Sequence, residues 1–138
     1  MRYSLLSAAL LLACGSSLPI TRPDAPAEGA PDMRERIRVS TPASNSAVRS
    51  PLTVRGEARG TWFFEASFPV TLRDAGGQIL AQAPAQAEGE WMTENFVPFS
   101  VTLTFQLPKP GAGTLVLEKD NASGLPEHAA ELRIPVQF

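Results

Sequence analysis

The sequence is poor in the side chains that most catalytic and metal sites require. Its 138 residues contain a single cysteine, Cys14, and a single histidine, His128. One cysteine excludes a disulfide within the chain and a zinc site built from cysteines. A Ser-His-Asp arrangement would depend on His128 alone, and no nucleophile-elbow motif or phosphate-binding loop is present. We therefore expect no enzyme, no metal and no cofactor, and a small hydrolase is the least supported class.

The balance of charge disfavours nucleic acid as a partner. The chain has 12 Lys and Arg against 14 Asp and Glu, which gives a formal net charge of -2. Binding to nucleic acid depends on clustered Lys and Arg that displace counterions from phosphates. Hydrophobic residues make up 43% and charged residues 19%, which is typical of a globular chain. The length allows one domain, or one domain with a tail. Thirteen prolines and ten glycines disfavour long helices.

The first residues have the pattern of an export signal. After Arg2, residues 5–13 consist of Leu, Ala and one Ser. This run is far shorter than the about 20 apolar residues of a membrane-spanning helix, and it is typical of the apolar core of a secretory signal peptide. We therefore predict a signal peptide at residues 1–13.

The run ends in LLACGS at residues 11–16, which resembles the lipobox of bacterial lipoproteins. The resemblance implies that Cys14 is acylated, becomes the first residue of the mature chain and anchors it to a membrane. Leu12 departs from the pattern, because a small residue is more usual there. The alternatives are a plain signal peptide that contains a cysteine, or a buried free cysteine. The expected location is the cell envelope: the outer membrane or periplasmic face in a two-membrane bacterium, and otherwise the extracytoplasmic face of the plasma membrane.

Residues 14–35 have the composition of a tether. They contain four prolines among Ala, Gly, Ser and charged residues, without apolar periodicity. Since proline favours extended chain, we predict a disordered, semi-stiff spacer that ends where a folded domain begins at residue 36. The alternative is an ordered arm that packs on the domain.

Apolar and polar side chains alternate along much of residues 36–138. A period of two is typical of antiparallel strands with one solvated face. Turn motifs rich in Gly, Pro, Asn and Asp separate the alternating segments. About seven short strands in about 100 residues predict an all-β antiparallel sandwich. The expected strands lie at residues 36–41, 52–57, 68–73, 78–83, 101–106, 114–119 and 132–137.

Large aromatic residues can fill the space between the two sheets of such a sandwich. Pro135 falls inside the last expected strand, which predicts an edge position or a bulge. The longest loops are expected at residues 60–67 and 84–98. The aromatic residues expected in the core are Trp62, Phe63, Phe64, Phe68, Trp91, Phe96, Phe99 and Phe105.

Several motifs together resemble the immunoglobulin-like domain of bacterial spore germination proteins. They are VSTP at 39–42, VRSPLTVRGEA at 48–58, WFFE at 62–65, FPV at 68–70, DAGG at 74–77, Trp91, PF at 98–99, the strand at Gly113, DNASGLP at 120–126 and IPVQF at 134–138. The resemblance covers about residues 37–138. It implies an immunoglobulin-like sandwich. Because no catalytic residues are established for the family, it also implies a binding or accessory module whose ligand stays open.

The candidate contact residues are Trp62, Phe63, Phe64, Glu65 and Trp91. Such a cluster could be a platform for a sugar or a peptide, and the alternative is core and loop packing. Of the two tryptophans, we expect Trp91 in the core and Trp62 as the better contact residue. Glu65 could act as an acid, and the alternatives are a solvated carboxylate or an ion pair with a nearby arginine, Arg59 or Arg73.

Two further motifs are weaker. Asp120, Asn121 and Ser123 resemble part of a calcium loop, but Ala122 occupies a ligand position, so we predict a hydrogen-bonded turn with Gly124 at positive φ. His128 is expected as an exposed loop residue.

Three functional classes follow from these patterns. The first is a lipid-anchored, monomeric interaction module that binds an envelope protein or a cell-wall glycan. The second is a structural or assembly accessory of the envelope without a ligand of its own, and the third is the small hydrolase. A filled sandwich leaves little volume for a deep pocket, so a ligand would meet loops or a sheet edge.

Overall fold

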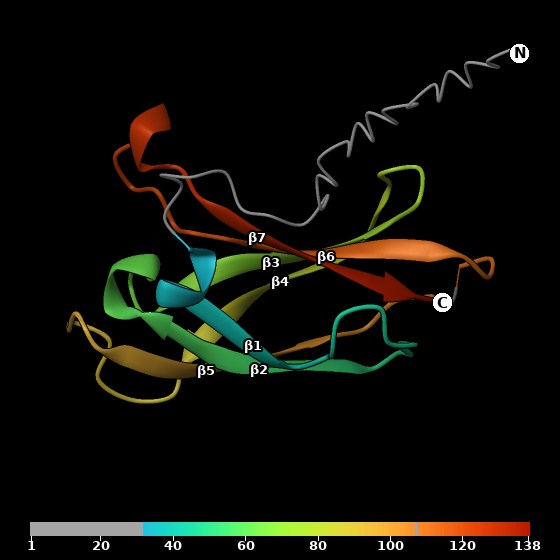
Figure 1. Cartoon of the computed structure of the whole chain (residues 1–138), viewed down its shortest axis with the longest axis horizontal. Coiled ribbons are helices and arrows are strands. Elements are labelled where there is room, and N and C mark those ends of the chain that lie inside the picture. Colours follow the sequence, from blue (N-terminus) through green and yellow to red (C-terminus); the bar gives the residue numbers. More distant parts are fainter. Residues whose placement is uncertain (1–31, 107) are drawn as a thin grey trace, which may run out of the picture. The chain divides into compact units, whose positions relative to one another are not determined.

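The computed structural model describes residues 32–106 and 108–138. The signal peptide predicted at residues 1–13, the acylation predicted at Cys14 and the tether as far as residue 31 lie outside the described residues. Within them the chain forms seven strands and three short 3-10 helices (Figure 1). In chain order these are η1 (Met33–Glu35), β1 (Ile37–Thr41), β2 (Leu52–Arg59), η2 (Gly60–Trp62), β3 (Ser67–Asp74), β4 (Ile79–Ala87), β5 (Phe96–Leu103), β6 (Ala112–Glu118), η3 (Pro126–His128) and β7 (Glu131–Gln137). None of these described helices has the length and apolar character needed to cross a membrane.

The antiparallel strands form two layers. Neighbouring strands lie in the order β1-β2-β5-β4-β3-β6-β7. β2 pairs with β5 at eight positions, whereas β4 and β5 share two pairs, Gln86 with Ser100 and Ala87 with Phe99. The sheet folds over at this narrow junction, so that β1-β2-β5 faces β4-β3-β6-β7 (Figure 1). The predicted immunoglobulin-like β-sandwich of seven strands is therefore confirmed for the described residues.

Alternation along the strands sends every second side chain into the space between the layers. In β5, the buried residues Val97, Phe99, Val101 and Leu103 alternate with residues that are more exposed. The same pattern in the facing strands supplies the opposite side of the core. The period of two that predicted strands therefore also predicted which side chains are buried.

Phe68 lies at the centre of the aromatic core. Its ring centroid is 4.9 Å from that of Phe99, 5.2 Å from Phe63 and 6.5 Å from Trp62, and each pair meets edge to face. Such pairs contribute about 0.5–1.5 kcal/mol each beyond the burial of their surface. Three of the eight aromatic residues expected in the core are not fully buried. Phe64 is 45% exposed, and Trp91 and Phe96 are only partly buried.

The last strand has the edge position that Pro135 predicted. β7 lies at one end of the strand order, and residues 45–48 run along its outer side. There Asn45 N donates to Pro135 O at 2.7 Å, and Val48 N donates to Gln137 O at 2.9 Å. The N–H and C=O of a strand residue point the same way, so the N–H that Pro135 lacks would face this side and not β6.

The strands that flank the second long loop extend further than predicted. β4 continues to Ala87 and β5 begins at Phe96, so the loop expected at residues 84–98 spans only 88–95. Pro84 and Pro98 have the sequence pattern of loop residues, but both lie in strands. The Pro98 carbonyl accepts from Glu88 N at 2.8 Å, so its ring nitrogen faces away from the long ladder with β2. A proline is tolerated at such a position.

The folded part also begins earlier than predicted. Residues 32–35 were assigned to the tether, but they form η1 and its N-cap. The Asp32 carboxylate accepts from Arg34 N at 3.0 Å, and Met33 packs partly buried against the core. Arg59 Nε donates to the Glu35 carbonyl at 3.0 Å. A local cap and one apolar contact thus add this turn to the domain.

Candidate functional site

Three chain connections meet at one end of the sandwich, at the left in Figure 1. They follow β2, β4 and β6. In the strand register the last residues of these three strands pair with the first residues of β5, β3 and β7, so all three connections leave the sheet at the same end. We call residues 60–66, 88–95 and 118–131 the loop end. Four of the five candidate contact residues lie in the first connection, and Trp91 lies in the second.

Trp62 belongs to the core, which corrects the expectation that it is the better contact residue. Its side chain is 1% exposed. The Arg36 guanidinium lies 5.5 Å from the ring centroid, and the Trp62 carbonyl accepts from Asp120 N at 3.0 Å. Phe63 is also buried, with 5% exposed. The 3-10 turn of η2 directs both rings inward, so Trp62 has no free face for a sugar or a peptide.

Trp91 is the tryptophan that reaches the surface. It is partly buried against the core and, with Phe63 and Met92, lines an open depression of about 370 Å³ between the first two connections. Met92 beside it is 75% exposed. Trp91 was expected in the core, and the structure places only part of the ring there. The depression joins aromatic surface to an exposed, adaptable thioether.

Close backbone packing holds the depression in shape. Gly60 N donates to the Asn95 carbonyl at 3.2 Å. A Cβ at Gly60 would overlap the carbonyl oxygens of Trp91 and Thr93, so this position needs glycine. Thr93 N donates to the Trp91 carbonyl at 2.8 Å, and Asn95 N donates to Thr93 Oγ1 at 3.2 Å. The two connections therefore form one packed unit.

Phe64 and Glu65 project from a tight turn in the first connection. Phe64 N donates to the Ser67 carbonyl at 2.9 Å, and Ser67 N donates back at 3.1 Å. Glu65 has φ 49 and is exposed. Among the described residues it forms no ion pair with Arg59 or Arg73. The solvated alternative therefore holds for its carboxylate in this structure.

The third connection contains the hydrogen-bonded turn that was predicted there. Asn121 Nδ2 donates to the Leu125 carbonyl at 2.8 Å, and Ser123 Oγ donates to Asn121 Oδ1 at 2.7 Å. Gly124 has φ 66. His128 is exposed, and its Nδ1 lies 3.0 Å from Ser123 Oγ. Within the described ranges no group of three or more His, Cys, Asp or Glu is arranged to hold a metal ion.

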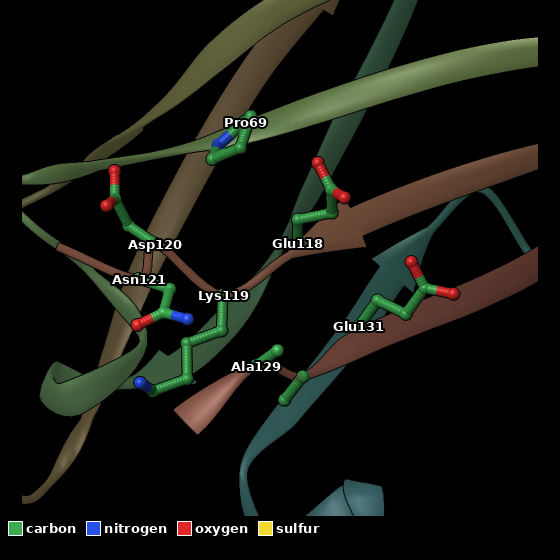
Figure 2. A pocket seen from close by; sticks show the side chains of 8 residues that line it. Pro69, Glu118, Lys119, Asp120, Asn121, Ala129 and Glu131 are labelled. Atoms are coloured by element: carbon green, nitrogen blue, oxygen red, sulfur yellow. The ribbon is translucent and has the colours of Figure 1, made fainter. Parts of the chain in front are cut away.

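A second open depression, of about 460 Å³, lies at the base of this connection (Figure 2). The carboxylates of Glu118 and Asp120 lie on the same side as Pro69, while Lys119 extends the opposite way (Figure 2). Lys119 Nζ donates to the His128 carbonyl at 3.2 Å. The lining contains no nucleophile beside a base and no aromatic platform. Its main property is its negative charge.

Sequence reasoning missed two residues of this site. Met92 was not singled out, although an apolar side chain between glutamates in an expected loop is a signal of exposed apolar surface. Gly60 could not be identified from its sequence neighbours, because its role depends on the close approach of the backbone at Trp91 and Thr93. Both residues take their role from contacts between connections about 30 residues apart.

One of three comparisons with known proteins found a match, and the match includes most of this site. The sequence profile of the Gmad2 family, described as the immunoglobulin-like domain of bacterial spore germination, matches residues 36–124. No curated protein matches the chain, and no solved structure matches it. The matched range includes the first two connections of the loop end and part of the third.

Proposed function

The chain belongs to the Gmad2 family of immunoglobulin-like domains, and on that premise we propose that it is a lipid-anchored, non-catalytic interaction module of the bacterial cell envelope. The family name refers to spore germination, but it does not by itself assign this chain to sporulation. The proposal has two parts: an anchor at the start of the chain, and a contact surface at the loop end.

The lipobox-like motif supports the anchor. Cys14 follows an apolar run of signal-peptide length, and it is the position where the lipoprotein pattern requires its cysteine. Two or more acyl chains hold a protein firmly to a bilayer, whereas one holds it weakly. The proline-containing residues that follow would space the domain from its lipid.

The aromatic depression at the loop end carries the contact part of the proposal. A contiguous patch of exposed apolar surface marks a binding site more often than single exposed apolar residues do, and aromatic residues and methionine are enriched at interfaces. Here Met92 is 75% exposed beside Trp91. An accessory without a ligand of its own has no need for such a surface, so the binding module is the better-supported class.

A protein partner fits this surface better than a neutral glycan. A sugar ring stacks on a flat, accessible aromatic face, but Trp62 is 1% exposed and Trp91 is partly buried. Methionine instead adapts to irregular apolar side chains. We therefore propose an envelope protein as the partner.

Site-specific crosslinking of the full-length lipoprotein in its own envelope tests the proposal. A photo-crosslinking amino acid replaces Met92, and a control carries it at Ile79, which is 50% exposed at the other end of β4. We expect a discrete adduct with an envelope protein from position 92 and none from position 79. The same adducts from both positions, or none from position 92, would contradict a contact surface at the loop end.

A further inference from the structure

We propose that the loop end recognises a cationic, partly apolar segment of its protein partner. This inference rests on the proposed function, because it names the chemistry of the segment that the same surface would bind. Its support comes from the distribution of charge and of exposed apolar side chains over the described residues.

Negative charge is concentrated at the loop end, although the whole chain is nearly neutral with a net charge of -2. Eight of the twelve carboxylates in the described ranges lie there, together with a single Lys or Arg, Lys119. The other nine described Lys and Arg lie outside these ranges, although Arg36 lies over the Trp62 ring, Arg59 donates to the Glu94 carbonyl and Arg133 pairs with Glu131. The eight acidic residues are Glu65, Glu88, Glu90, Glu94, Glu118, Asp120, Glu127 and Glu131.

Most of these carboxylates are available to a partner. Between described residues, the Glu131–Arg133 pair, at 2.6 Å, is the one ion pair that involves a loop-end carboxylate. Lys119, the cation nearest to the second depression, donates to a backbone carbonyl and not to a carboxylate. Even with Lys119, Arg36, Arg59 and Arg133 counted against the eight carboxylates, an excess of four negative charges remains at the loop end (8 − 4), and it would attract a positively charged segment.

Exposed apolar side chains gather at the same end. Of the four large hydrophobic residues exposed in the described ranges, Phe64, Met92 and Leu125 lie in the loop end, with 45%, 75% and 45% of their surface exposed. The fourth, Ile79, lies at the far end of β4. Charge alone would attract any cation, whereas apolar surface and charge together select a segment that has both Lys or Arg and apolar side chains.

The three glutamates around Met92 distinguish best between a basic ligand and an acidic one. Glu88, Glu90 and Glu94 are exposed on the connection that lines the aromatic depression. A lysine or arginine could approach the Trp91 ring while its charge meets these carboxylates. An anionic headgroup or an anionic glycan would meet repulsion at the same place. The observations therefore favour a basic protein segment over either of these ligands.

The test adds charge variants to the crosslinking of the full-length protein from position 92. One variant carries Glu88→Gln, Glu90→Gln and Glu94→Gln. The matched control raises the net charge by the same amount at the opposite end, with Gln78→Lys, Gln106→Lys and Gln137→Lys at exposed positions. Urea unfolding verifies that both variants are as stable as the parent chain.

We expect the glutamine variant to lower the adduct yield about tenfold, since three exposed charge pairs contribute modestly and add up. The lysine control should leave the yield within about twofold of the parent. Raising the salt from about 50 mM to about 500 mM should lower the parent yield more than that of the glutamine variant, which keeps the other five loop-end carboxylates. Mass spectrometry of the adduct should find a segment with a net positive charge and apolar side chains at the crosslink.

Two results would overturn the inference while leaving the proposed function in place. One is an adduct on a neutral or acidic segment of an envelope protein. The other is an adduct whose yield is equal in the parent and in the glutamine variant. The absence of any adduct from position 92, or an adduct on a glycan, would instead overturn the proposed function and the inference with it.

Discussion

Replacing Gly60 by alanine tests whether the first two connections of the loop end form one packed unit. Gly60 is buried, and its N–H bonds to the Asn95 carbonyl at 3.2 Å. The added Cβ would overlap the carbonyl oxygens of Trp91 and Thr93. These oxygens belong to the backbone and cannot rotate away like a side chain. Residues 88–95 must therefore move outward, and the depression that contains Trp91 must change shape.

The structure sets the size of the effect. Overpacking a filled site costs about 1–3 kcal/mol, and loss of the hydrogen bond to Asn95 adds about 1 kcal/mol. Alanine also lowers the conformational entropy of the unfolded chain, which offsets about 0.4–1 kcal/mol of this loss of stability. We therefore expect the free energy of unfolding to fall by about 1–3.6 kcal/mol. In a domain of about 100 residues each kcal/mol shifts the Tm by about 4–8 °C, so the Tm should fall by at least about 4 °C.

Urea and thermal unfolding of the full chain measure this loss, with Gly76→Ala as the matched control. A Cβ at Gly76 would lie 3.4 Å from Asp74 Oδ1, an ordinary contact, so the control should stay within about 0.5 kcal/mol of the parent. Tryptophan fluorescence should also shift to the red in Gly60→Ala as Trp91 gains exposure. Equal unfolding midpoints for the two alanine variants would refute the packing described for the loop end.

Two further predictions concern the tryptophans and the anchor. Trp62→Ala should lower the free energy of unfolding by about 3–5 kcal/mol, because it empties a core site. Trp91→Ala should cost only about 1–2 kcal/mol, because part of its ring is already exposed; urea unfolding compares the two, and a larger loss for Trp91→Ala would reverse their assignment. Cys14→Ala should abolish incorporation of labelled fatty acid, and label that persists in this variant would show that the lipobox interpretation is wrong.

The strands could be predicted because burial between two sheets imposes a period of two on the sequence. Leu52 and Val54 show it clearly, and both are buried in β2. The rule fails where small residues and prolines replace the pattern. The end of β4 consists of Ala, Gln and Pro, so its last residues resemble a loop in sequence although they pair with β3 and β5.

The site was harder to predict because it depends on contacts between distant connections. Three consecutive aromatic residues at 62–64 have no alternation, so the sequence does not tell which ring points inward. The turn of η2 decides this, burying Trp62 and leaving Phe64 exposed. Charge segregation was also hidden, since acidic residues scattered along the chain come together only when the three connections meet at one end.

The way in which Arg59 joins η1 to the loop end has a mechanical consequence. Its guanidinium donates to the Glu35 carbonyl at 3.0 Å and to the Glu94 carbonyl at 3.4 Å. The chain enters the described domain at Asp32, directly before η1. Tension between that entry point and a partner held by residues 88–95 would load this short linkage as well as the paired strands. Because this linkage lies in parallel with the ladders of β1 with β2 and of β2 with β5, it would take part of the load that these ladders otherwise bear.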